Sequence, residues 1–141
     1  MAAADRIFID TSLLVHAHDL DSGLKRAIAE QVLTQLWEDE TGVLSTQVLL
    51  EFYAALTGAI ASPVPRRAAR ELMHAYSAWP VITLDATDVQ AASDFEERYR
   101  LPYRDALAVV AARKSGAALL LSDSVRPYRP ITGLDVQNPF A

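Results

Sequence analysis

The chain has 141 residues, of which 51% are hydrophobic and 22% are charged. This length and composition predict one globular domain over residues 1–141 and exclude intrinsic disorder. The 18 acidic and 13 basic side chains give a net charge of −5, which argues against a protein that coats nucleic acid by bulk electrostatics. The absence of cysteine excludes disulfides, zinc-thiolate sites and a cysteine nucleophile, and favours a reducing compartment, the cytoplasm.

The sequence shows no targeting or membrane-spanning pattern. Its first residues lack the basic stretch and apolar core of a signal peptide. Apolar runs are interrupted by charged residues before they reach the roughly 18 residues that a membrane span needs. We therefore expect a soluble intracellular domain.

The first half of the chain predicts two strands among helices. A strand over 6–10 ends in Asp10, and Thr11 or Ser12 is expected to cap a short helix over 13–18. Apolar residues at helical spacing predict a helix over 24–40. A short strand over 43–45 and helices over 47–60 and 66–78 follow, separated by Pro63 and Pro65.

The second half continues the alternation. A strand is expected over 81–84, then a helix capped by Asp85 or Thr87 that ends near 100. Pro102 opens the next helix, over 103–115, and strands follow over 117–121 and 134–137. Because strands alternate with helices and no hairpin signal occurs, we predict a three-layer α/β/α sandwich with a central, mostly parallel sheet.

Two acidic residues follow predicted strands. Asp10 ends the first strand, and Asp123 lies just after the strand over 117–121. Because ligands bind outside the carboxyl ends of strands in open parallel sheets, both are expected at one sheet edge. Taken singly, each has an alternative interpretation as a cap of the next helix or turn.

Two further acidic residues lie in predicted helices. Glu51 has only apolar neighbours over 48–56, so its carboxylate would cost several kcal/mol unless it is paired or binds a cation. An ion pair with an arginine is the open alternative. Asp105 lies in the first turn of its helix, where it also complements the helix dipole, but the residues after it are apolar.

Convergence of these four acids would require a counter-ion, because their mutual repulsion would otherwise raise some of their pKa values. Oxygen ligands without cysteine suit Mg²⁺ or Mn²⁺. Such ions bind phosphate oxygens and generate hydroxide from water. The pattern therefore indicates phosphoryl chemistry.

The sequence resembles a PIN domain and, more narrowly, the VapC-like toxins of bacterial type II toxin–antitoxin pairs. The similarity runs in order through nearly the whole chain, in the segments 8–15, 44–53, 101–107, 119–124 and 133–140. It implies a PIN-like α/β/α sandwich and an endoribonuclease dependent on Mg²⁺ or Mn²⁺ that hydrolyses RNA phosphodiester bonds. It also implies a homodimer and a cognate antitoxin that covers the acidic pocket.

The sequence departs from the family pattern at two places. Ser12 stands where the family usually has asparagine, two places after the first acid. Ser124 stands where the fourth acid is usual, nineteen residues after Asp105, and Asp123 precedes it. Either Asp123 substitutes for that acid through a small loop shift, or the site has three acids.

The resemblance and the residues together suggest a role for each candidate. Asp10 and Asp105 are expected to be the principal metal ligands, and Glu51 to bind the metal or orient the attacking water. Asp123 is the conditional fourth catalytic and metal-binding acid. Further candidates are three hydroxyl groups that support the ligands and three arginines that contact RNA: Ser12, Ser122 and Ser124, and Arg104, Arg126 and Arg129. The alternative for the arginines is ordinary solvated surface charge.

Two other functions remain as alternatives. A catalytically weakened PIN domain that binds RNA or an antitoxin is suggested by Ser124. A phosphatase of the haloacid-dehalogenase type also begins with a strand ending in an acid, but it needs a second aspartate where this chain has Ser12. That difference disfavours the phosphatase.

Overall fold

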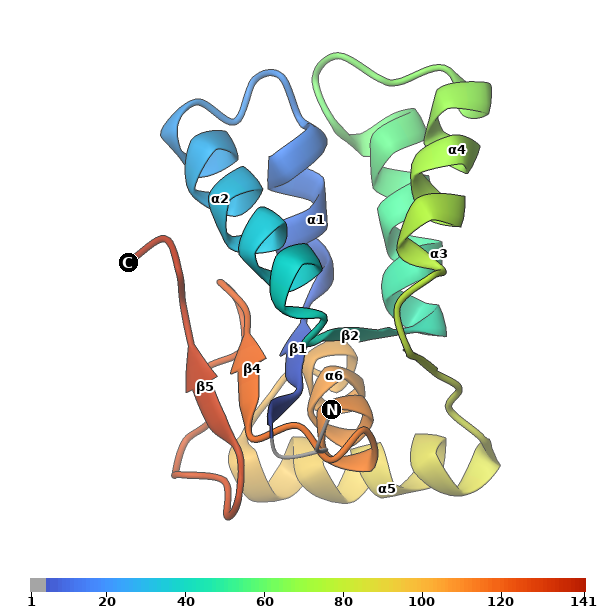
Figure 1. Cartoon of the computed structure of the whole chain (residues 1–141). Coiled ribbons are helices and arrows are strands. Elements are labelled where there is room, and N and C mark those ends of the chain that lie inside the picture. Colours follow the sequence, from blue (N-terminus) through green and yellow to red (C-terminus); the bar gives the residue numbers. More distant parts are fainter. Residues whose placement is uncertain (1–4) are drawn as a thin grey trace.

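The computed structural model describes residues 5–141. Its strands are β1 (Ile7–Ile9), β2 (Gly42–Ser45), β3 (Val81–Ile82), β4 (Leu119–Leu121) and β5 (Asp135–Gln137). Its helices are α1 (Thr11–His18), α2 (Leu24–Asp39), α3 (Thr46–Ala54), α4 (Arg66–Tyr76), α5 (Ala86–Tyr99) and α6 (Tyr103–Lys114), and α3 continues into a π-helical turn, η2 (Ala55–Ala59) (Figure 1).

The strands form one sheet in the order β3-β2-β1-β4-β5. Every paired strand runs parallel to its neighbour, with Ile7 opposite Gly42 of β2 and opposite Leu119 of β4. The chain first builds outward from β1 to β2 and β3, and later returns to add β4 and β5 on the other side. The sheet therefore has its topological switch point between β1 and β4.

Helices cover both faces of the sheet. Helix α6 contacts β2 and β4, and α5 packs against α6, whereas α2 contacts β2 and α1 packs against α2. Figure 1 shows α1 and α2 above the strands and α5 below them. The predicted three-layer α/β/α sandwich with a parallel sheet is confirmed.

The core lies where the strands meet these helices. Phe8, Val43, Leu44 and Leu120 are fully buried, as expected for short parallel strands that helices cover on both sides. A Cβ atom on Gly42 would lie only 2.4 Å from the ring of Trp79. The close contact between β2 and this ring therefore requires glycine.

Two helix boundaries differ from the sequence prediction. Helix α1 begins at Thr11, and its cap is Asp10, whose carboxylate accepts the backbone N–H of Thr11 at 2.8 Å. The predicted caps are thus wrong, because the extended Asp10 at the strand end already reaches the first free N–H groups. The single helix predicted over 47–60 ends in η2, where the Thr57 hydroxyl bonds the Tyr53 carbonyl at 2.8 Å and disturbs the helical ladder.

No helix within residues 5–141 is both long enough and apolar enough to cross a bilayer.

Candidate active site

The site lies at the carboxyl ends of β1 and β4, the two strands that flank the switch point. Asp10 directly follows β1, and Ser122 directly follows β4. Ser122 Oγ donates a hydrogen bond to Asp10 Oδ2 at 2.7 Å. The neighbouring strands therefore bring together two of the predicted residues that lie far apart in the sequence.

The Asp10 carboxylate is buried, with only 1% of the residue exposed. Its Oδ1 accepts the N–H of Thr11 at 2.8 Å and lies 2.7 Å from Nη2 of Arg104. Its Oδ2 accepts hydrogen bonds from Ser122 and from Nη1 of Arg104, the latter at 2.8 Å. Because a carboxylate has about four acceptor positions, these contacts occupy the whole group.

Glu51 approaches from α3 and remains 26% exposed. Its Oε1 accepts hydrogen bonds from Thr11 Oγ1 and from Arg104 Nη2, each at 2.7 Å. Its Oε2 accepts one from Arg104 Nε at 3.2 Å. The ion pair with an arginine, which the sequence left open, is therefore present.

Asp105 reaches the same place from the first turn of α6. The residue is buried, with 4% exposed. Its Oδ1 accepts hydrogen bonds from Arg104 Nη1 at 3.1 Å and from Ser124 Oγ at 3.2 Å. Three acids from separate elements thus converge on one guanidinium.

Arg104, at the centre of these contacts, retains 35% exposure of its side chain. Burial alone would lower the pKa of Arg104, but hydrogen bonds to Asp10 and Glu51 and their charges outweigh burial and raise the pKa above its ordinary value. Arg104 was predicted to contact RNA, and it was not identified as the arginine that pairs with the acids. The available signal was its position directly before Asp105.

Within residues 5–141, Asp123 is not among the acids that pair with Arg104. Its Oδ2 lies 3.4 Å from Nε2 of His16, whose Nδ1 lies 2.8 Å from the hydroxyl of Ser22. Ser124, the next residue, is the one that contacts Asp105. Asp123 lines one cavity together with the three acids, so its role as a fourth acid stays a prediction.

A cavity of about 700 Å³ opens over this cluster. Ser12 lines it, and its Oγ is buried without a hydrogen-bond partner among residues 5–141. Among the residues that line the cavity are all four predicted acids and two of the predicted hydroxyl groups: Asp10, Glu51, Asp105, Asp123, Ser12 and Ser124.

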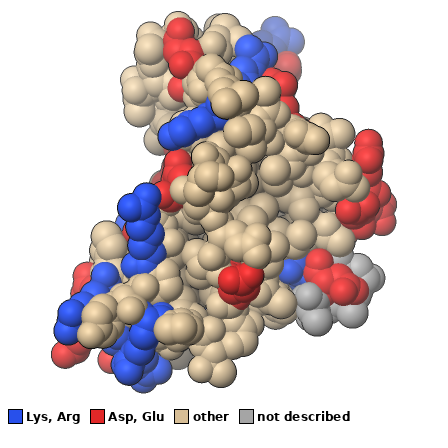
Figure 2. Space-filling view, turned by 90° about the vertical axis from the view of Figure 1, so that its left-hand side faces the viewer, with Lys and Arg blue, Asp and Glu red and all other residues tan. Residues whose placement is uncertain are grey.

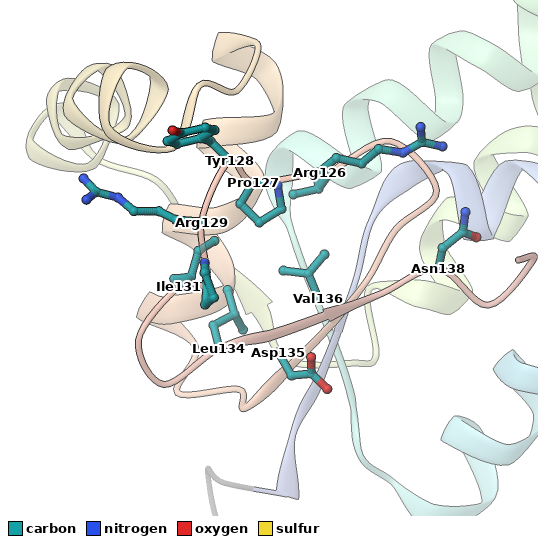
Figure 3. Close-up of a pocket in the computed structure, with 11 residues that line it drawn as sticks. Arg126, Pro127, Tyr128, Arg129, Ile131, Leu134, Asp135, Val136 and Asn138 are labelled. Carbon is teal, nitrogen blue, oxygen red and sulfur yellow. The ribbon is translucent and has the colours of Figure 1, made fainter.

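Arg126 and Arg129 lie elsewhere. They line a separate pocket of about 480 Å³ near β5. Their side chains point away from each other in Figure 3. In the same pocket, Tyr128 stacks against Arg100, whose guanidinium carbon lies 4.0 Å from the ring centre. The structure does not bring these two predicted RNA contacts to the acids.

The donor chemistry of the cluster fits a hard divalent cation. Three carboxylates surround one cationic group, and the buried Ser12 hydroxyl beside them has no partner within the described part of the chain. As arranged in residues 5–141, however, no three acidic or histidine side chains are placed to hold one ion. The guanidinium of Arg104 lies among the three carboxylates, and Asp10, Glu51 and Asp105 are the residues that would hold such an ion.

Comparison with known proteins identifies structures of the same fold. A chain of a toxin–antitoxin complex from Klebsiella pneumoniae is 20% identical, with a TM-score of 0.69 over 94% of this chain and 97% of its own. The VapC20 toxin of Mycobacterium tuberculosis, described as cleaving the sarcin–ricin loop, is 20% identical, with a TM-score of 0.57 over 81% and 86%. A chain of FitAB bound to an IR36 DNA fragment is 12% identical, with a TM-score of 0.70 over 96% of each chain.

The sequence comparison agrees with the fold. None of the curated proteins matches the chain. The family model of the PIN domain matches residues 7–126, a range that contains every acid of the cluster. The chain therefore belongs to the PIN domain family.

Proposed function

We propose that this chain is a divalent-metal-dependent endoribonuclease and the toxin of a toxin–antitoxin pair. The observation that carries the proposal is the convergence of three acids, Asp10, Glu51 and Asp105, on the guanidinium of Arg104. They meet at the switch point of the sheet in a PIN domain. The likeness to a toxin–antitoxin complex and to a toxin that cleaves the sarcin–ricin loop supports it.

The three acids differ in burial, and we assign their roles accordingly. A bound Mg²⁺ or Mn²⁺ would supply a Lewis acid for the phosphate oxygens and lower the pKa of a bound water. Asp10 and Asp105, both buried, would hold it with fixed carboxylates, and Ser122 keeps Asp10 oriented. Glu51 is the most exposed of the three acids, so its Oε2 is the atom we assign to orienting the attacking water and taking its proton.

RNA is the proposed substrate, although the surface is not broadly basic. Figure 2 shows Lys and Arg side chains along the lower left of the face it presents and again near its top, with acidic side chains among them in both places. Most of that face is uncharged. With a net charge of −5, the protein would depend on local phosphate contacts, such as those of Arg126 and Arg129, rather than on a continuous basic surface.

A cognate antitoxin and a second copy of the chain are the proposed protein partners. The similar structures, a toxin–antitoxin complex and FitAB bound to DNA, support an antitoxin. Large apolar side chains are exposed near α1, α2 and α3, at Leu20, Leu24 and Leu50, where protein contacts would remove them from water.

A binding-only PIN domain is the second candidate. Two observations favour it: Arg104 neutralises part of the acidic charge, and Ser124 replaces the usual fourth acid. Such a protein would bind RNA or an antitoxin without turnover.

RNA cleavage by the purified chain tests both candidates. Fluorescent RNA would be incubated with Mn²⁺ or with EDTA, using the native protein and Asp105→Asn. The nuclease requires cleavage with Mn²⁺ alone and a loss of roughly 100-fold or more in the variant, with unchanged circular dichroism. Equal cleavage by the two proteins would reject the assigned site, and RNA binding without any Mn²⁺-stimulated cleavage would favour the second candidate.

A further inference from the structure

Arg104 occupies the point at which the three acids converge. All its nitrogen atoms are engaged: Nε with Glu51, Nη1 with Asp10 and Asp105, and Nη2 with Asp10 and Glu51. The donor-to-acceptor distances run from 2.7 to 3.2 Å. One side chain therefore bridges acids from three separate elements.

The contacts of Arg104 use the oxygen positions that a metal ion would need. Thr11 and Ser122 take one position on each oxygen of Asp10, and Arg104 takes the other on each. No acceptor position on this carboxylate is left for another cation. The guanidinium and a metal ion at Asp10 are thus mutually exclusive.

The acids, and not the helix, hold Arg104 in this position. Arg104 lies in the first turn of α6, where the positive end of the helix dipole disfavours a cation. Asp10 and Asp105 are buried close to Glu51 and would repel one another without a counter-ion. The guanidinium supplies that counter-ion within the chain itself.

We propose that Arg104 is an intramolecular counter-ion that stabilises the metal-free site and competes with the divalent cation for Asp10, Glu51 and Asp105. This inference rests on the metal dependence proposed above. Arg104 lines the cavity and keeps 35% exposure, so rotation of its long side chain into the cavity frees the carboxylates without moving α6. The competition lowers the affinity for metal and keeps the metal-free protein folded.

Metal affinity tests the competition directly. Mn²⁺ binding would be titrated by electron paramagnetic resonance in the native protein, in Arg104→Gln, and in Arg98→Gln as the matched control. Arg98 is an exposed arginine of α5 that does not line the cavity. We expect Arg104→Gln to bind Mn²⁺ about tenfold more tightly or better, about 1.4 kcal/mol, and Arg98→Gln to bind like the native protein. Unchanged or weaker binding by Arg104→Gln would overturn the proposal.

Thermal unfolding separates competition from a purely structural role. In EDTA, Arg104→Gln should melt below the native protein, because its acids lose their counter-ion. Saturating Mn²⁺ should raise its melting temperature by more than it raises that of the native protein. If Arg104→Gln melts below the native protein but Mn²⁺ raises both melting temperatures equally, Arg104 has only a structural role, and the proposed competition is overturned.

A second variant keeps the test decisive if Arg104→Gln does not fold. Arg104→Lys retains the charge, but its single ammonium cannot reproduce the planar fork that reaches three carboxylates. It should bind Mn²⁺ more tightly than the native protein, and equal binding would overturn the proposal. If the Arg104 variants bind Mn²⁺ more tightly but the native protein does not cleave RNA, the proposed nuclease activity is rejected and the competition stands. If none of the proteins binds Mn²⁺, both proposals are rejected.

Discussion

Ser124 donates a hydrogen bond to Asp105, with 3.2 Å between Oγ and Oδ1. Ser124 stands at the position where the resemblance to VapC-like toxins predicts a fourth acid, so a neutral hydroxyl orients Asp105 where a carboxylate would repel it. The preceding Asp123 faces His16. Arg104 thus bridges three of the four predicted acids.

Restoring the fourth acid should strengthen metal binding. In Ser124→Asp, a carboxylate would lie beside Asp105 and add negative charge that Arg104 cannot neutralise alone. We expect tighter Mn²⁺ binding, by roughly tenfold, and a lower melting temperature in EDTA. Ser124→Ala, which removes only the hydrogen bond, is the control. Mn²⁺ affinity no higher in Ser124→Asp than in Ser124→Ala would contradict this prediction.

Asp123 should matter less for cleavage than the three converging acids. Its carboxylate contacts His16, and in the described part of the chain it forms no ion pair with Arg104. We expect Asp123→Asn to retain RNA cleavage within about tenfold of the native rate, whereas Asp10→Asn loses it. Cleavage rates at saturating Mn²⁺ check this, and an equal loss in the two variants would assign Asp123 to the metal site after all.

Ser122 should contribute to the stability of the fold as well as to the site. Its buried Oγ donates to Asp10 and accepts the N–H groups of Ser124 and Val125. Ser122→Ala removes one donor to Asp10 and takes this acceptor from the N–H groups of Ser124 and Val125, so we expect a loss of about 1–3 kcal/mol in the free energy of unfolding. Urea denaturation measures it, with the exposed Ser62→Ala as control. Equal stability of the two variants would contradict this role.

The stability of the protein should depend on the titration of His18. Burial disfavours the imidazolium and lowers the pKa of His18 from its ordinary 6.5; Nε2 lies 2.9 Å from the hydroxyl of Tyr76. The unfolded chain therefore binds this proton more readily than the folded protein. The stabilisation is complete above pH 6.5 and is lost as the pH falls through the lower value of the folded state.

Urea denaturation at pH 5 and pH 7.5 checks this dependence. The native protein should lose more stability between these two pH values than His18→Gln, which lacks the imidazole of His18. A variant with the same pH dependence as the native protein would show that His18 is not responsible.

Local patterns explain why much of the fold was predictable. Short apolar segments such as Leu119–Leu121 and the acid after β1 are properties of neighbouring residues, and the parallel sheet follows from their alternation with helices. The convergence of Asp10 and Asp105 was predictable because strand ends and helix starts meet at one edge. The cap of α1 was not predicted correctly because one residue, Asp10, follows β1, caps α1 and also belongs to the site.

The partners of the polar groups could not be predicted in the same way. The direction of Arg104 depends on Glu51 and Asp10, which lie 53 and 94 residues away in sequence. The pairing of Asp123 with His16 spans 107 residues. Such pairs depend on where helices pack in three dimensions, and no local spacing reports them.

Anomalous diffraction from crystals of the native chain soaked in Mn²⁺ tests the central claim most directly. The account predicts a manganese peak between the carboxylates of Asp10 and Asp105, with the guanidinium of Arg104 turned out into the cavity. A saturated crystal with no peak there, and with Arg104 still bonded to all three acids, would contradict it.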